Sequence, residues 1–294
     1  MYKPWRSPLV TERVEYITGL SPEGRAWLER VDEVVAELAL KWNLRLGEPL
    51  DHDGYTAVIV AAETETGEQA ILKLAFQHME SRDEAKGLEF WSGDPTVRLL
   101  ASDPATDAML LERCRPGHSL NDVPESEREE ILARMIQRLW RAPPADHGFR
   151  HLSEMVDYWC RESRADEERW PDPVLVREGL AAFEELARPR VGDVLLGTDI
   201  HAGNVLAAER EPWLVIDPKP FVGNRAYDAL QHMFDKIDVV AIDPVGFVKR
   251  WSAYLGLPEK DVRAWAFARF AAERHQDAAD WRRTNDVARR LRVS

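Results

Sequence analysis

Three polar side chains in the second half of the chain have the types and the spacing needed to handle phosphate. Asp199 and Asn204 lie five positions apart on one segment, and Asp217 follows thirteen residues later at the end of an apolar run. A carboxylate can take the proton of a nucleophilic hydroxyl, and carboxylate and amide oxygens are ligands of Mg²⁺. The pattern predicts phosphoryl transfer, with Asp199 as the base and Asn204 and Asp217 as metal ligands.

Each of these residues also has an ordinary structural interpretation. Asp and Asn are common turn residues before strands, and Asp217-Pro218 is a common way to leave a strand. The complete order, with an apolar segment on either side, favours catalysis over turn formation. His201 could form an Asp-x-His metal pair with Asp199, but no third ligand stands at a suitable spacing. We therefore expect His201 to hold the loop by hydrogen bonds.

Composition limits the class of protein. The chain has 294 residues, of which 45% are hydrophobic, so it can bury a full core as one large domain or two lobes. The formal net charge is −13, which argues against nucleic acid or an anionic membrane as the main partner. That charge is compatible with a cationic small substrate, and also with a simple role in solubility.

Cysteine usage and hydropathy bear on location. Cys114 and Cys160 stand in no metal or redox spacing, which indicates a reducing compartment. Residues 1–6 lack the apolar core of a signal peptide, and no run approaches the roughly 20 apolar residues of a membrane span. We expect a cytoplasmic protein.

The first part of the chain has the pattern of a small sheet with helices. Ser21-Pro22 is typical of a helix start, and the apolar spacing from Leu28 to Leu38 continues that helix. Turn residues separate the later segments. The elements predicted after this helix are strands 56–62 and 69–76, a helix over 80–91, and strands 97–101 and 108–112.

The pattern becomes mainly helical after residues 114–117. Ser126 and Glu129 have the spacing of a capping box that opens a helix. We place a lobe boundary here, between residues 1–113 and 114–294. The elements predicted in the second lobe are helices 126–140, 152–168 and 173–187, a hairpin of 204–208 with 213–216, and a helical tail over 244–291.

Residues 198–206 (Thr-Asp-Ile-His-Ala-Gly-Asn-Val-Leu) and 216–219 (Ile-Asp-Pro-Lys) resemble the aminoglycoside phosphotransferases, in particular the branch of streptomycin 6-kinases and hydroxyurea-resistance kinases. The similarity runs over roughly residues 46–234. It implies an α+β, protein-kinase-like two-lobed fold, with a small N-terminal antiparallel β lobe and a larger, mainly helical C-terminal lobe. ATP and Mg²⁺ are implied as cofactors, with GTP as an alternative nucleotide. Further matches downstream are Val222-Gly223-Asn224, Tyr227-Asp228 and Gln231-His232.

The same resemblance gives the first lobe a nucleotide-binding role and the second a catalytic and acceptor-binding role. Lys73 would contact the α- and β-phosphates, where a compact positive charge is needed. Glu84 would be its ion-pair partner, in competition with Glu80 and Glu89. Without the downstream motif, Lys73 could equally be a solvated lysine at a strand edge.

Residues 110–117 resemble the linker that binds adenine. Glu112 and Cys114 would contribute backbone C=O and N–H groups, although a plain turn between lobes would have the same appearance. Residues 50–56 occupy the place of the phosphate-covering loop, but they hold one glycine and no glycine-rich motif.

The chain departs from the family just before the proposed base. Most members have His two positions before the catalytic Asp and Gly one before it, and here Gly197 and Thr198 stand there. This departure leaves a pseudokinase as an alternative. Lys219, two residues after Asp217, could contact phosphate or balance the charge of Asp217, and both interpretations stay open.

An acidic stripe near the C-terminus is the candidate acceptor site. Glu273, Asp277 and Asp280 fall at i, i+4 and i+7, which is one helical face, and could bind ammonium groups. A solvated acidic face balanced by nearby arginines is the competing interpretation. We expect four neighbouring aromatic residues to lie in the core: Trp265, Phe267, Phe270 and Trp281.

The sequence therefore predicts a small-molecule O-phosphotransferase that moves the γ-phosphate of ATP to a hydroxyl of an aminoglycoside-like acceptor, with antibiotic resistance as its expected effect. An aminocyclitol is the first acceptor to consider, and the substrate would be cationic and hydroxylated. The alternatives are a metabolic kinase of the same fold acting on a sugar or amino alcohol, and a nucleotide-binding pseudokinase.

Overall fold

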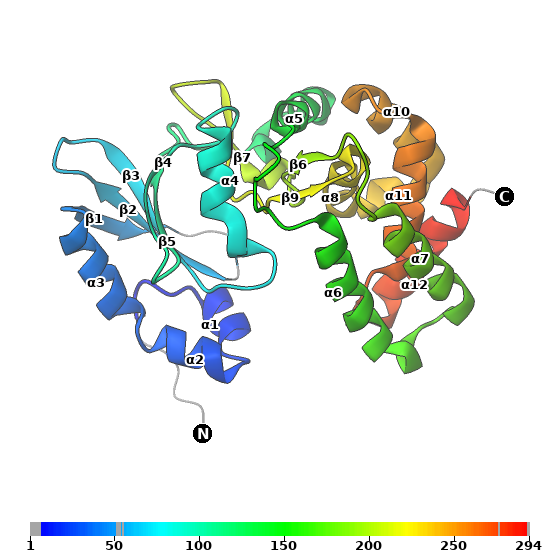
Figure 1. Cartoon of the computed structure of the whole chain (residues 1–294), viewed down its shortest axis with the longest axis horizontal. Helices are drawn as coiled ribbons and strands as arrows, with labels where there is room; N and C mark the ends of the chain where they lie inside the picture. The colour runs from blue at the N-terminus through cyan, green and yellow to red at the C-terminus, as the bar shows by residue number, and fades with distance from the viewer. Residues whose placement is uncertain (1–6, 51–53, 55, 276, 293–294) are drawn as a thin grey trace. The chain divides into compact units, whose positions relative to one another are not determined.

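The computed structural model of the chain describes residues 7–50, 54, 56–275 and 277–292. The chain forms two compact units, one ending at Gly117 and the other beginning at His118 (Figure 1). The first contains an antiparallel sheet with helices, and the second is mainly helical. The predicted α+β class is confirmed.

The sheet of the first unit has the order β1-β2-β3-β5-β4, with all neighbours antiparallel. Four strands fall where the sequence predicts them. The fifth, β1, was not predicted, because the segment Arg-Leu-Gly-Glu-Pro carries little of the apolar alternation that marks a strand. The strands are β1 (Arg45–Pro49), β2 (Ala57–Glu63), β3 (Gln69–Ala75), β4 (Leu99–Asp103) and β5 (Ala108–Glu112).

The helix predicted from Pro22 to Leu38 is wrong in one respect, because it is two helices. Ser21 caps the first as expected, since its hydroxyl accepts a hydrogen bond from the N–H of Gly24. The N–H of Arg30 then bonds to the carbonyl of Trp27, three residues back, and this tighter turn ends the helix. The helices of this unit are α1 (Glu12–Thr18), α2 (Pro22–Leu28), α3 (Val31–Lys41) and α4 (Glu84–Trp91).

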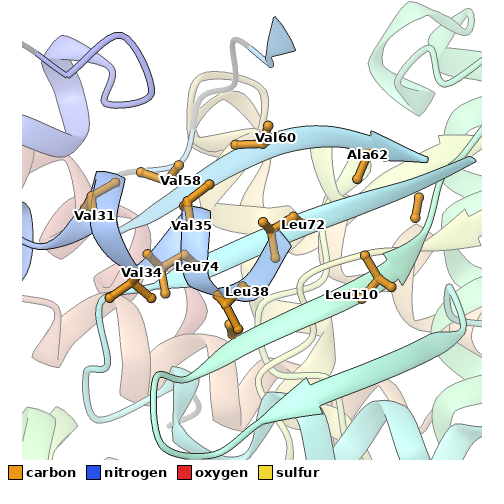
Figure 2. Packing of buried hydrophobic residues seen from close by; sticks show 12 residues of the cluster. Val31, Val34, Val35, Leu38, Val58, Val60, Ala62, Leu72, Leu74 and Leu110 are labelled. Carbon is orange, nitrogen blue, oxygen red and sulfur yellow. The ribbon is translucent and has the colours of Figure 1, made fainter. Parts of the chain in front are cut away.

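Helix α3 covers one face of the sheet (Figure 2). Its buried stripe, which includes Val35 and Leu38, packs against Leu72 and Leu74 of β3. Complete burial of each such side chain contributes about 1.5–3 kcal/mol. Because successive strand residues point to opposite faces, this packing directs Lys73 to the other face of the sheet.

The second unit contains eight helices among its described residues, together with two small two-stranded sheets. Helix α11 packs closely on α7, and a Cβ added at Gly179 would lie 2.4 Å from the Cβ of Ala271. The helices are α5 (Glu125–Leu139), α6 (Leu152–Ala165), α7 (Pro173–Leu186), α8 (Leu230–Asp235), α9 (Ile237–Ile242), α10 (Pro244–Leu255), α11 (Glu259–Ala272) and α12 (Ala278–Leu291).

The two small sheets flank the loops that carry Asp199, Asn204 and Asp217. One pairs β6 (Val194–Leu196) with β9 (Phe221–Gly223), and the other pairs β7 (Val205–Ala207) with β8 (Trp213–Val215). The second pair is the predicted hairpin. Among the described residues, no helix is long and apolar enough to cross a membrane.

The capping box predicted at Ser126 is wrong. Helix α5 begins one residue earlier, at Glu125, after Pro124 and with no side-chain cap. Glu129 does not reach back to the helix start, because it accepts hydrogen bonds from Arg250 at 3.1 and 3.3 Å. A tertiary ion pair has replaced the local cap.

Candidate active site

The first unit contributes a buried ion pair. Lys73 on β3 donates through Nζ to both carboxylate oxygens of Glu84, at 2.6 and 2.8 Å, and both side chains are buried. Glu84 is the first residue of α4, so the pair links the central strand of the sheet to the helix on its second face. The predicted pairing with Glu84, ahead of Glu80 and Glu89, is confirmed. Contact of this pair with phosphates stays a prediction.

The predicted adenine linker follows the last strand of this unit. Glu112 ends β5, and its backbone N–H donates to the carbonyl of Arg98 at 2.9 Å. Cys114 lies two residues further on, half-buried and outside any disulfide. Their role toward a nucleotide stays a prediction. The predicted phosphate-covering loop, 50–56, lies largely outside the described residues.

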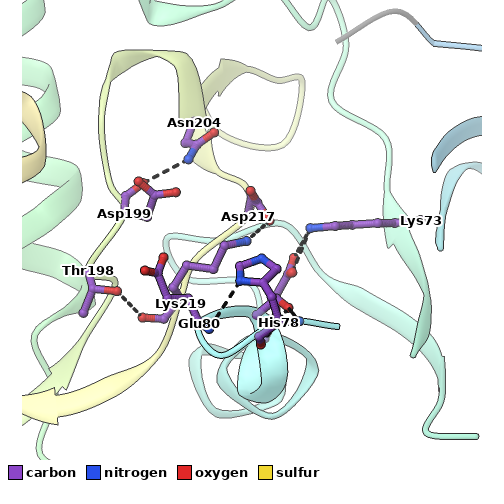
Figure 3. Close-up of polar contacts among 10 residues, drawn as sticks. Lys73, His78, Glu80, Thr198, Asp199, Asn204, Asp217 and Lys219 are labelled. Carbon is purple, nitrogen blue, oxygen red and sulfur yellow. Dashed lines mark hydrogen bonds and ion pairs between the residues drawn. The ribbon is translucent and has the colours of Figure 1, made fainter. Parts of the chain in front are cut away.

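The second unit brings Asp199 and Asn204 together on one loop between β6 and β7. The Asn204 side chain donates through Nδ2 to the backbone carbonyl of Asp199 at 2.9 Å (Figure 3). This bond orients the amide so that its oxygen points away from the loop. The hydroxyl of Ser119 donates to the carbonyl of Ala202 at 3.1 Å and holds the same loop from outside.

Asp217 reaches this loop because β7 and β8 form a hairpin. Val205 pairs with Val215, and the N–H of Ile216 donates to the carbonyl of Asn204 at 2.9 Å. Residues 204 and 216 therefore lie side by side, and Asp217 comes directly after them. Asp217 has a left-handed backbone with φ of +53°, and its carboxylate accepts a hydrogen bond from Lys219. Lys219 thus balances the charge of Asp217, and contact with phosphate stays open.

His201 acts on the loop, as expected. Its Nδ1 accepts a hydrogen bond from the N–H of Gly203 at 3.2 Å, and burial lowers the pKa of its imidazole, so the ring stays neutral and can accept. No group of three or more potential His, Cys, Asp or Glu metal ligands occurs among the described residues. A metal held here would therefore depend on oxygen donors such as Asn204 and Asp217.

Asp228 holds the backbone just before Asp199, a role that the sequence analysis did not predict. This fully buried carboxylate accepts hydrogen bonds from the N–H groups of Gly197 and Thr198, at 3.3 and 2.9 Å, and from the indole of Trp140 at 2.9 Å. Burial raises the pKa of Asp228 to about 6, although the three donors oppose that shift. The match of Tyr227-Asp228 to the family pattern was the available signal, but it carried no role for the carboxylate.

The packing around Gly197 explains why the histidine usual at this position is absent. A Cβ at this position would lie 2.4 Å from Cγ1 of Ile200, so the fold leaves no space for a side chain. The backbone is instead held by hydrogen bonds, since the carbonyl of Gly197 accepts from the N–H groups of Asp199 and Lys219 at 2.7 and 2.8 Å. The loop is ordered without the histidine.

The prediction that three acidic residues near the C-terminus share one helical face is wrong. Glu273 ends α11 in an extended conformation, and Asp277 caps the start of α12, so the two carboxylates belong to different helices. Glu273 pairs with Arg269 at 3.0 Å, and Asp277 accepts from the N–H of Ala279. The role of Glu273, Asp277 and Asp280 toward an acceptor stays a prediction, without the helical stripe that motivated it.

The aromatic residues of this region are core residues, as expected, with one exception. Trp265, Phe270 and Trp281 are fully buried, whereas Phe267 is partly exposed. Trp265 packs edge-on against Tyr227, with ring centroids 5.4 Å apart.

A sheet that carries a buried Lys–Glu pair, and a helical unit that carries an Asp-Asn-Asp group on adjoining loops, define a protein-kinase-like phosphotransferase. The choline kinase LicA of Streptococcus pneumoniae shares this fold, with a TM-score of 0.60 at 12% identity, over 88% of this chain and 99% of that one.

The sequence profile of the aminoglycoside/hydroxyurea antibiotic resistance kinases matches residues 42–283, so the chain belongs to this family. It is 32% identical to a streptomycin 6-kinase of Streptomyces glaucescens over 276 residues, which cover 90% of this chain and 89% of that protein. It is 35% identical to a hydroxyurea phosphotransferase of Kitasatospora aureofaciens over 260 residues, covering 84% and 73%.

Membership makes the chain an ATP-dependent kinase that acts on hydroxylated small molecules, with a divalent metal as the general requirement of such kinases. The predicted family, fold and enzyme class are confirmed.

Proposed function

We propose that the chain transfers the γ-phosphate of ATP to a hydroxyl of a cationic, aminoglycoside-like molecule, with an aminocyclitol as the first acceptor to test. The observation that carries this proposal is the group of Asp199, Asn204 and Asp217, which backbone and amide hydrogen bonds hold on adjoining loops. The net charge of −13 favours a cationic acceptor. Cys114 and Cys160 form no disulfide, which suits a cytoplasmic location.

Asp199 would do the proton chemistry. Its carboxylate would accept a hydrogen bond from the acceptor hydroxyl, and would take the proton as the new O–P bond forms and the bond to ADP breaks. His201 is neutral and accepts a hydrogen bond from the loop backbone. Asp199 is then the residue of that segment proposed to take the proton.

The oxygen donors of the second unit fit Mg²⁺. Asn204 uses its Nδ2 on the loop, which leaves an oriented amide oxygen, and Asp217 adds a carboxylate that Lys219 keeps in place. Bound Mg²⁺ would neutralise charge on the β- and γ-phosphates. Lys219 would then share Asp217 with the metal or turn to phosphate.

The first unit would supply the nucleotide contacts. Lys73, oriented by both oxygens of Glu84, would place its charge on the α- and β-phosphates. Backbone groups of Glu112 and Cys114 would bind adenine. ATP is the expected donor, and a parallel assay with GTP distinguishes the two.

The test is phosphate transfer from Mg-ATP to a panel of streptomycin-type aminocyclitols, other aminoglycosides, hydroxyurea, sugars and amino alcohols. Asp199→Ala should abolish transfer while ATP binding, measured by calorimetry, persists. Turnover that survives in Asp199→Ala would exclude it as the base. Transfer only to sugars or amino alcohols would indicate a metabolic kinase, and ATP binding without any transfer would indicate a pseudokinase.

A further inference from the structure

Just beyond the end of β6, the side-chain hydroxyl of Thr198 makes a hydrogen bond that a backbone N–H would make in a regular strand pair. In the β6–β9 pair Val194 lies opposite Gly223, and Leu196 lies opposite Phe221. Continuing that register by two residues sets Thr198 opposite Lys219. The residue between, Pro220, has no N–H to donate, so the backbone ladder cannot simply continue.

The backbone N–H of Thr198 is also diverted from the ladder, because it donates to Asp228. The Thr198 hydroxyl donates instead, to the carbonyl of Lys219 at 2.6 Å (Figure 3). The N–H of Lys219 donates in return to the carbonyl of Gly197 at 2.8 Å. These two bonds join the residues just before Asp199 to the residue that follows Asp217 by two.

Both joined segments have unusual backbone conformations. Thr198 has φ of +50°, which is a rare value for a β-branched residue, and Asp217 has φ of +53°. Such conformations persist where the surroundings determine them strongly, and they gather at functional sites. Glycine would adopt this φ without strain, but glycine has no hydroxyl. Threonine at position 198 therefore keeps the hydroxyl hydrogen bond, at the cost of a strained backbone that glycine would relieve.

We propose that the Thr198 hydroxyl is a positioning group, which sets the place of Asp199 relative to Asp217. The inference rests on the roles proposed above for those two carboxylates. Thr198 is only 4% exposed, so its bond to Lys219 is shielded from competing water. It acts on the reaction through the backbone of Lys219 and touches no reacting atom.

Three substitutions at one position test this role. Thr198→Val keeps the shape and removes the hydroxyl, Thr198→Gly removes the hydroxyl and relieves the φ strain, and Thr198→Ser keeps the hydroxyl. Loss of one buried hydrogen bond predicts that Val and Gly lower kcat by about tenfold. We expect the same variants to raise the Mg²⁺ concentration for half-maximal rate, with little change in the KM for ATP, and Ser to restore both values.

The Gly variant is the sharpest of the three, because a defect there cannot come from added strain. A matched control removes the hydroxyl-to-carbonyl bond of another buried residue in the same unit, that of Ser252 to Lys249 at 3.1 Å on α10. Ser252→Ala should lower Tm slightly and leave kcat and the Mg²⁺ dependence unchanged. If the parent turns over and Thr198→Val matches it in both, the positioning role is wrong and the proposed function stands.

A second measurement does not depend on turnover. Hydrogen–deuterium exchange of the amides in residues 197–204 should be faster in Thr198→Val than in the parent, and unchanged in Ser252→Ala. Unchanged exchange in Thr198→Val would overturn the inference. Faster exchange in that variant would support the role of the hydroxyl in fixing the loop. If the parent also phosphorylates no acceptor, the proposed function is overturned while that role stands.

Discussion

The two units hold their polar groups by opposite means. In the first, Lys73 and Glu84 stand on a regular strand and a regular helix, and each is placed by the opposite charge of the other. In the second, Asp199 and Asp217 stand on irregular loops, and hydrogen bonds to the backbone hold those loops. A charge on a rigid element needs one partner, whereas a charge on a loop needs the loop itself to be held.

The two units should also differ in whether a substitution lowers stability or activity. A buried ion pair can be replaced by apolar residues with little loss of stability, since its desolvation offsets much of its attraction. Buried backbone groups have no such substitute, because each must keep a hydrogen bond. Substitutions in the two units should therefore fail in different ways.

The largest effect is expected for Asp217→Asn. It removes the carboxylate proposed to hold the metal and the negative charge that Asp217 presents to the buried Lys219. We expect kcat to fall by about a thousandfold or more, equivalent to about 4 kcal/mol, in steady-state assays of ADP release. Asp238→Asn is the matched control, because the Asp238 side chain is 85% exposed on α9. A variant of Asp217 that keeps a tenth of the activity would remove it from the metal site.

The ion pair of the first unit should show the stability side of the comparison. Lys73→Met removes the positive charge beside the buried carboxylate of Glu84, so we expect a loss of about 3–5 kcal/mol in the free energy of unfolding. The double variant Lys73→Met/Glu84→Leu should recover most of that stability without recovering activity. Chemical denaturation measures the first quantity and an ATP assay the second. Recovery of activity in the double variant would contradict the proposed phosphate contact.

Asp228 predicts that the stability of the folded chain depends on pH. Burial raises its pKa from 3.8 to about 6 in the folded chain, so its favourable contribution is complete below about pH 4 and is lost as the pH rises through 6. Relative to Asp228→Asn, which does not titrate, the parent should lose about 2–3 kcal/mol of unfolding free energy between pH 4 and 7. Urea denaturation at several pH values tests this. Parallel curves for the two proteins would show that the three donors outweigh burial.

The smallest effect is expected for Glu273→Gln. Its carboxylate is already engaged by Arg269, so it has little charge to offer a cationic acceptor. We expect the acceptor KM to change by less than about threefold, which corresponds to less than 1 kcal/mol. An increase of tenfold or more, with the KM for ATP unchanged, would instead assign Glu273 to the acceptor site.

The parts of the site that the sequence predicts are those that depend on local order. Lys73 lies on a strand rich in apolar residues, and Asp199, Asn204 and Asp217 flank one hairpin, so spacing alone indicates that they come together. The same holds for four of the five strands in the first unit. Local sequence patterns were sufficient to predict these residues and strands, because each depends on neighbours that are close in the chain.

The parts that could not be predicted depend on contacts between distant residues. Asp228 acts on a loop thirty residues earlier, and nothing in its own neighbourhood shows those donors. The acidic stripe failed because α11 ends at Ala272, so that Glu273 and Asp277 belong to different helices although the acidic spacing continues. The cap of α5 failed because Glu129 is drawn to Arg250, 121 residues away.

The alternation along β3 links correct folding to activity. Leu72 and Leu74 face α3, and Lys73 faces the other way, paired with Glu84. Slippage of this strand by one residue would exchange the two faces, so that a lysine would enter the apolar layer and a leucine would take the place of the lysine proposed to contact phosphate. A misregistered chain would therefore lose its core and its Lys73–Glu84 pair in the same event, and no stable, half-active form of this lobe should accumulate.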